Sequence, residues 1–535
     1  MPTRRVFWRP TFCGATLCGA TLAALVLACL PLVATADKLA LKSPAKPLSA
    51  IDWLSQSLVT PAALPAPPAE PPVSPKGATP DTVTVQTLGA DTTDSLGVLP
   101  ASVTGLPQAM WGIAKVSDIA ALLSQDLGQD LPALQGLLMT LLLAEADPPA
   151  GTPPGESLFL ARVDKLMAIG ALDQARALLD TAGAARSPEI FRRYFDVALL
   201  IGDEDRACAA LQATPGLAPA LPTRIFCLAR AGDFATAHLT LDTAKALGTV
   251  SPEEAALLTR FMNPELDDTG ITPLLPNPVT PLVFRIYQAI GAPLPDTTLP
   301  IAFTYADLSD HAGWKAQLDA VERLSRAGSV APNLLLGLYT QQKPAASGGV
   351  WDRVAAFQAV DAAIAARDAK AVDRSLPPVW AMMKAAQLEV PFATLYGKAL
   401  SKLSLTGDAA RVAETVMLLS PDYEKLTLGL TSADPKLGFL LATARDNFTG
   451  VIPPDELTRA IMTAFTAPEI PADLQAMVDQ GRLGETILRT LAVLRQGEAG
   501  DLRAVTEGLS VLHKLGLEDV ARRTALQMIL LDRRG

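Results

Sequence analysis

The sequence predicts an all-α protein whose helices pair into hairpins and stack as an α-solenoid. Apolar residues make up 49% of the chain but aromatic residues only 5%. Ala, Leu and Val must therefore supply most of the packing, which suits close helix contacts better than sheets. At 535 residues the chain is longer than one compact core usually serves, so we expect repeats or several domains. Helix-start signals and a recurring glycine support the same fold class.

Residues 1–36 have the features of a secretory signal peptide. Three arginines open the segment, an apolar stretch follows, and the triplet Ala-Thr-Ala at 34–36 fits the rule for cleavage before Asp37. We therefore expect a periplasmic or secreted protein, exported by the general secretory route, with no membrane insertion once the signal is removed. The run TRRVFWR also resembles a twin-arginine signal, so that route stays open, as do a lipid-modified Cys29 and an uncleaved anchor.

The net charge of the chain is −10, and removal of the three arginines of the signal would take it to −13. An acidic surface repels the phosphates of nucleic acids and of anionic lipids. We therefore expect neither nucleic acid nor a lipid surface as a partner.

Residues 37–105 are expected to form a disordered linker rich in Pro and Ala. The stretch TPAALPAPPAEPPVSPKGATP, at 60–80, has too many prolines for a helix and too little apolar mass for a core. Such a composition is typical of a semi-rigid spacer.

The run SAIDWLSQSL, at residues 49–58, interrupts this linker. In a helix, Ile51, Leu54 and Leu58 would fall on one stripe, with Trp53 at its edge. Tryptophan is a frequent anchor of interfaces, so we predict a docking motif that binds a partner or the solenoid of this same chain. The alternative is a short apolar run without a function.

After the linker the pattern is helical almost throughout, and prolines divide it. We expect a helical repeat domain at 106–263, a Pro-rich connection at 264–300 and a second helical repeat domain at 301–535. Ser187 and Ser251 each precede a proline and an acidic residue, which is the pattern of a helix N-terminus.

A glycine recurs in the first of these domains, at Gly170, Gly202 and Gly232, with spacings of 32 and 30 residues. Glycine ends a helix readily because it enters the left-handed conformation at little cost. An alanine follows each glycine after five residues, and a leucine follows that alanine after four, so that a second helix can pack closely on the first. These residues are Ala175, Ala207 and Ala237, and Leu179, Leu211 and Leu241. The period is typical of helical hairpins that stack on one another.

Residues 158–250 resemble tetratricopeptide repeats, and the run AGDFATAHLTLDTAKALG carries the resemblance best. In that run Gly232 fits the turn between two helices, and Ala237 and Ala244 fit the two small packing sites. A similar arrangement recurs at Gly516, although the first helices carry little of the family's aromatic signature. The resemblance implies a solenoid with a concave surface for a protein partner. Ordinary helices with a fortuitous glycine spacing are the alternative.

Cys208 and Cys227 are the cysteines that remain after removal of the signal. In an oxidising compartment two cysteines most simply form one disulfide. The predicted hairpins place them on adjacent antiparallel helices, which can bring them within bonding distance. Two buried thiols are the alternative.

The sequence carries no motif for nucleotide, dinucleotide or metal binding, and none for a nucleophilic serine. We therefore predict no catalytic, cofactor-binding or metal-binding residue, no cofactor and no small-molecule ligand. The acidic cluster of Asp203, Glu204 and Asp205 falls on a predicted exposed turn, where solvation explains it.

These observations favour a non-enzymatic periplasmic scaffold or adaptor that binds a protein partner in the cell envelope. A motility or division machine is one class of partner that an exported solenoid could serve. The alternative function is that of a helical envelope hydrolase, acting on cell-wall or sugar substrates through dispersed carboxylates. A purely structural spacer is a third, minor interpretation.

Overall fold

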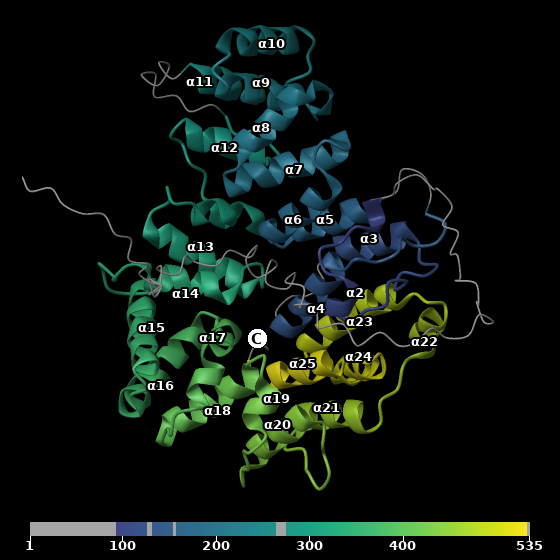
Figure 1. Cartoon of the computed structure of the whole chain (residues 1–535), viewed down its shortest axis with the longest axis vertical. Coiled ribbons are helices and arrows are strands. Elements are labelled where there is room, and N and C mark those ends of the chain that lie inside the picture. Colours follow the sequence, from purple (N-terminus) through teal and green to yellow (C-terminus); the bar gives the residue numbers. More distant parts are fainter. Residues whose placement is uncertain (1–92, 126–130, 153–156, 264–273, 532–535) are drawn as a thin grey trace, which may run out of the picture. The chain divides into compact units, whose positions relative to one another are not determined.

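The computed structural model describes residues 93–125, 131–152, 157–263 and 274–531, all within one compact unit of the chain. These residues form helices joined by mostly short loops, as the sequence predicts (Figure 1). Over these ranges no strand is formed, and extended pairing is limited to one isolated bridge. The fold is all-α, an array of packed helical neighbours.

Consecutive helices from α5 to α10 pair across the glycine turns that the sequence predicts. α5 contacts α6, α7 contacts α8, and α9 contacts α10. Gly170, Gly202 and Gly232 have φ angles of 78°, 81° and 81°, so each takes the left-handed conformation that glycine adopts at little cost. The helices are α5 (Leu158–Ala168), α6 (Leu172–Ala182), α7 (Pro188–Ile201), α8 (Glu204–Ala213), η2 (Pro215–Leu217), α9 (Leu221–Arg230), α10 (Phe234–Ala246) and α11 (Pro252–Met262).

Buried alanines and serine caps, both recognisable in the sequence, stabilise these hairpins. Ala175, Ala207 and Ala237, the expected small packing sites, are all 0% exposed, as expected of residues packed between paired helices. Ser187 caps α7 through its hydroxyl, and Ser251 forms a capping box with the first turn of α11. α7 and α11 therefore begin where the sequence indicates.

A buried arginine anchors the segment that precedes the hairpins. This segment contains η1 (Thr93–Ser95) and α2 (Ala101–Thr104) and leads to α3 (Val116–Ser124) and α4 (Pro132–Leu143). Arg162, on α5, is 1% exposed. Its guanidinium donates to the carbonyl oxygens of Leu142, Ala144 and Leu96 at 2.8, 2.7 and 2.8 Å. One side chain with several donors thus joins the segment to α4 and α5.

The expected Pro-rich connection contains a helix of its own, α12 (Pro281–Ala289), which packs against α7 and α11. Two 3-10 helices follow, η4 (Asp296–Thr298) and η5 (Ile301–Leu308), and η5 contacts α7 and α13. The next helices are α13 (Trp314–Arg326), α14 (Pro332–Gln341), α15 (Val350–Ala365), α16 (Ala369–Ala385), α17 (Glu389–Leu400) and α18 (Gly407–Leu419). The last are α19 (Tyr423–Thr427), α20 (Pro435–Arg445), α21 (Glu456–Thr466), α22 (Ala472–Asp479), α23 (Leu483–Glu498), α24 (Leu502–Lys514) and α25 (Glu518–Leu530). Gly516, between α24 and α25, has a φ of 75° and repeats the glycine turn.

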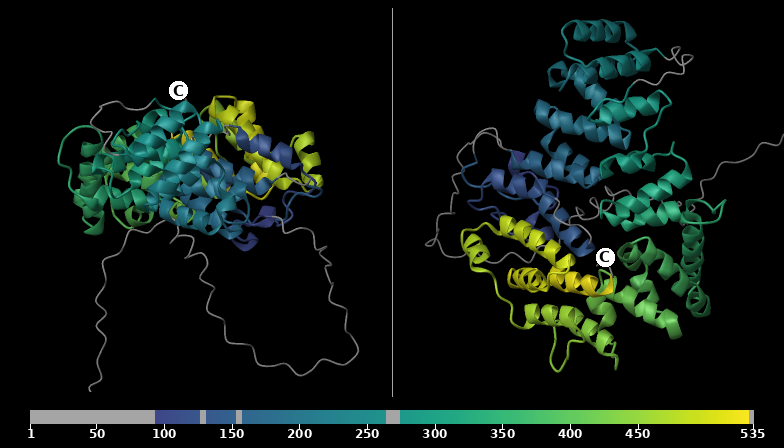
Figure 2. Two further views of the ribbon diagram at one scale, coloured as in Figure 1. Left: turned by 90° about the horizontal axis from the view of Figure 1, so that it is seen from above. Right: turned by 180° about the vertical axis from the view of Figure 1, so that it is seen from behind.

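Helices near the two ends of the described ranges pack against each other. α4 contacts α25 and α3 contacts α23 (Figure 1, Figure 2). The backbone N–H of Ala133 donates to the Gln527 side chain, and that of Gly484 donates to the Met110 carbonyl, both at 2.8 Å. Trp111 lies so close to Gly484 that an added Cβ would come within 2.6 Å of the indole. The two ends of the described array therefore complete each other's core.

Candidate functional site

Helix α10 carries apolar side chains on its packed side and also on its exposed side. Its inner side packs on α9 and α11 and buries Leu241 with two alanines. The opposite side presents Ala235, Leu239, Thr243 and Ala246, which lie one turn apart along the helix and are exposed. Leu239, at the middle of this outer face of α10, is 69% exposed. The exposed leucine with two exposed alanines beside it makes this face a candidate surface for a partner.

Two more large apolar residues are exposed at the ends of α10, although Phe234 falls on the side of Leu241 and not on the outer face. Phe234, at the first position, is 46% exposed, and Leu247, directly after the helix, is 68% exposed. Asp242 and Lys245 are the charged neighbours on the helix itself and lie 3.7 Å apart, so they largely offset each other. Apolar contact is therefore what this surface offers a partner.

A disulfide braces the hairpin next to this surface. Cys208 on α8 and Cys227 on α9 are bonded, with their Cα atoms 5.2 Å apart. This is the pairing that the sequence predicts. Because α10 packs on α9, the bridge fixes the helix from which α10 projects.

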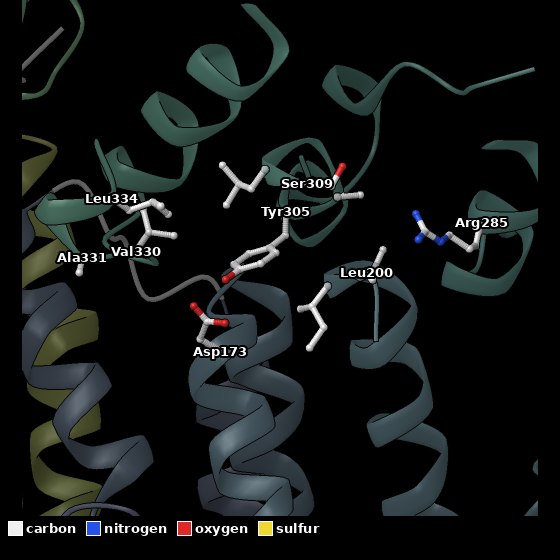
Figure 3. A pocket seen from close by; sticks show the side chains of 12 residues that line it. Asp173, Leu200, Arg285, Tyr305, Ser309, Val330, Ala331 and Leu334 are labelled. Atoms are coloured by element: carbon white, nitrogen blue, oxygen red, sulfur yellow. The ribbon is translucent and has the colours of Figure 1, made fainter. Parts of the chain in front are cut away.

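A cavity of about 220 Å³ lies where α6, α7, α12, η5 and the start of α14 meet (Figure 3). Its lining is mostly apolar, with Asp173, Tyr305, Arg285 and Ser309 as the residues with polar side chains. The apolar lining comes from Leu200, Ile201, Ala306, Leu308, Val330, Ala331 and Leu334, and Gly202 completes it. The cavity therefore joins the first hairpins to the helices that follow the Pro-rich segment.

Asp173 and Tyr305 form a hydrogen-bonded pair in this cavity. Asp173 is in the first turn of α6, and the Tyr305 hydroxyl donates to its carboxylate (Figure 3). Burial raises the pKa of the Asp173 carboxyl, and the hydrogen bond from Tyr305 opposes the rise. Burial and the neighbouring carboxylate also raise the pKa of the Tyr305 phenol, so the phenol keeps its proton.

Arg285 lines the same cavity but already has partners. Its guanidinium donates to Glu204 at 3.0 Å and to Gln288 at 2.9 Å. Glu204 also pairs with Arg230 at 3.3 Å and is only 4% exposed. The expectation of a solvated acidic turn is therefore wrong for Glu204, because two arginines from other helices cover its carboxylate. Asp205 does lie exposed and pairs with the same Arg230.

Several sequence-predicted features lie outside the described residues. These are the signal peptide at 1–36, most of the linker at 37–105, and the predicted docking residues Ile51, Trp53, Leu54 and Leu58. The repeat turns and the cysteines lie within the described ranges, and Cys227 belongs to the hairpin that carries α10 while Cys208 lies on the preceding helix.

The residues of the cavity carry no signal in the sequence. Asp173 and Tyr305 are 132 positions apart, and each belongs to an ordinary amphipathic stretch. No motif or spacing connects two side chains that only tertiary packing brings together.

Within the described ranges no helix is long and apolar enough to cross a bilayer. Within the same described ranges, no three or more His, Cys, Asp or Glu side chains lie close enough together to hold a metal ion. Comparison with models of known protein families, with the sequences of curated proteins and with solved structures finds no match to this chain.

Proposed function

We propose that this chain is a non-enzymatic scaffold of tetratricopeptide-like hairpins that binds a protein partner in the cell envelope. The outer face of α10 is the observation that carries the proposal. Its central residue, Leu239, is 69% exposed, whereas Leu241 and two alanines on the opposite side of the helix are buried. Exposed apolar surface of this kind is typical of protein interfaces.

The hairpin architecture supports a scaffold. Stacked hairpins present extended surfaces made of side chains from many helices. Gly170, Gly202 and Gly232 each turn one helix back on the next, and a buried alanine follows each of them. Such an array holds its surfaces in fixed positions without needing a catalytic centre.

The disulfide supports an exported protein. Bonds between cysteines persist in oxidising compartments such as the periplasm and are rare in the cytosol. The pair Cys208–Cys227 joins two helices of the array. With the signal-like residues 1–36 it favours the cell envelope as the place where the partner is met.

The test begins with the partner. Chemical crosslinking in intact cells, followed by mass spectrometry, names candidate proteins, and each purified candidate is then titrated with this protein. Burial of a leucine side chain contributes about 2 kcal/mol, so Leu239→Ala should weaken the affinity roughly 30-fold.

Leu428→Ala is the matched control, because Leu428 is 66% exposed and lies on the segment after α19. It should leave the affinity within about twofold of wild type. If no candidate binds in purified form, or if both variants change the affinity equally, the α10 face is not the partner surface. Unchanged thermal unfolding of both variants excludes loss of fold as the cause.

A further inference from the structure

The cavity between α6, α7, η5 and α14 has apolar walls and a carboxylate at its floor. Leu200, Val330 and Leu334 line it, while the carboxylate of Asp173 points toward the Tyr305 hydroxyl (Figure 3). The volume of about 220 Å³ equals roughly seven water molecules of liquid. A single flexible side chain fits a space of this size.

The charge of Asp173 is unmatched within the described part of the chain. No lysine, arginine or histidine there pairs with it, and the Tyr305 hydroxyl is its side-chain donor. Arg285, the cation in the lining, is already shared between Glu204 and Gln288. A half-buried carboxylate without a counter-ion is costly, and burial accordingly raises its pKa. The missing complement is a cation.

We propose that this cavity binds the side chain of a lysine that the protein partner presents. The inference rests on the proposed function as a partner-binding scaffold and adds the chemistry of one contact. The four-carbon stem of the lysine packs against the apolar walls, and its ammonium group donates to the Asp173 carboxylate.

Lysine fits better than the other candidates. An ammonium has three donors, and the Asp173 carboxylate and the Tyr305 oxygen lie side by side as acceptors in the lining (Figure 3). Arginine has five donors in a rigid plane, and the apolar walls would leave some of them without an acceptor. An apolar side chain would fill the space but would remove water from Asp173 without neutralising it.

The experiment uses two short peptides, acetyl-Ala-Lys-Ala-amide and its counterpart with norleucine in place of lysine. Both are titrated into the full chain with labelled leucine and valine methyl groups, and the resonances of Leu200, Val330 and Leu334 report binding in the cavity. We expect the lysine peptide to shift these resonances and to bind at least tenfold more tightly than the norleucine peptide. Asp173→Asn should abolish this preference.

Two further variants serve as controls. Tyr305→Phe removes one acceptor of the ammonium group but keeps the charge of Asp173, so lysine binding should weaken while the preference over norleucine remains. Asp242→Asn, an exposed acid on α10, should leave the titration unchanged. Equal affinity for the two peptides, a preference that survives Asp173→Asn, or no methyl shift at about 10 mM peptide would overturn the proposal.

The titration needs no partner protein, so it is independent of the Leu239→Ala test. If wild type shows no preference for the lysine peptide but Leu239→Ala still weakens partner binding, the scaffold function stands and the cavity is rejected as a lysine site. A lysine preference without any effect of Leu239→Ala would reject the α10 surface alone.

Discussion

Replacing Arg162 by methionine keeps most of the side-chain volume and removes every donor from the site. The carbonyl oxygens of Leu142 and Ala144 would then be buried without their present partner, and the partly buried carbonyl of Leu96 would lose its donor. An unsatisfied buried acceptor costs about 1–3 kcal/mol, so the three together cost roughly 3–9 kcal/mol.

The same change also removes the cost of burying a cation. Burial lowers the pKa of Arg162 from 12.5 to about 10, although the nearby Asp94 carboxylate opposes the shift. A shift of this size corresponds to roughly 3 kcal/mol. The carbonyl contribution is the larger of the two, so we expect Arg162→Met to lower the free energy of unfolding by about 3 kcal/mol.

Urea unfolding followed by far-UV circular dichroism measures the loss, and hydrogen exchange locates it. The amides of Val98 and Leu99, which donate to the Leu143 carbonyl, should lose protection first. Arg193→Met is the matched control, because Arg193 pairs with Asp164, whose carboxylate is 52% exposed and stays solvated. It should cost about 1 kcal/mol or less. An unchanged urea midpoint for Arg162→Met, or equal losses in both variants, would refute the reasoning.

Three other changes have defined outcomes. Replacing Cys208 and Cys227 by serine should lower the free energy of unfolding by about 3 kcal/mol, which is the chain-entropy value for the loop that the disulfide closes. Free-thiol titration of denatured, unreduced wild type tests the bridge, and two reactive thiols per chain would contradict it. Burial raises the pKa of Asp196 to about 6, above its ordinary 3.8, although Arg192 and Arg193 oppose the rise. The folded state therefore holds the Asp196 proton more tightly than the unfolded state, so the free energy of unfolding falls as the pH rises from 4 to above 6. In urea titrations, the free energy of unfolding of Asp196→Asn should exceed that of wild type by up to about 3 kcal/mol at pH 8 and should equal it at pH 4. Changing Trp53 and Leu54 to alanine should reduce crosslinking to the partner at unchanged thermal stability if the docking motif is external, or lower the stability if it docks on this chain; no change in either would reject the motif.

The hairpins could be predicted because their determinants are local. A glycine that must turn the chain and an alanine five residues later both belong to one short stretch, so their spacing alone indicates the fold. Gly202 and Ala207 illustrate this, since the first has a φ of 81° and the second is fully buried. The disulfide followed from the same geometry once the two cysteines were placed on adjacent helices.

The cavity and the buried charges could not be predicted, because they depend on contacts between distant segments. Glu204 looks like a turn residue in its own stretch, yet Arg230 and Arg285 approach it from other helices. Arg162 likewise has the sequence context of a surface residue on an amphipathic helix. Its carbonyl partners include Leu96, 66 positions earlier, which periodicity cannot reveal.

The packing of α4 against α25 has a consequence for how this chain folds. A stack of hairpins usually forms by nearest-neighbour contacts and can start anywhere along its length. Here the backbone of Ala133 donates to the side chain of Gln527 across 394 positions, so α4 cannot gain this neighbour until the last of the described helices has been synthesised. Closing so long a loop slows folding and leaves α4 with an uncovered flank until α25 arrives. Removing α25 should therefore speed the exchange of backbone amide hydrogens in α4 more than in the hairpins that lie between α4 and α25 in the sequence.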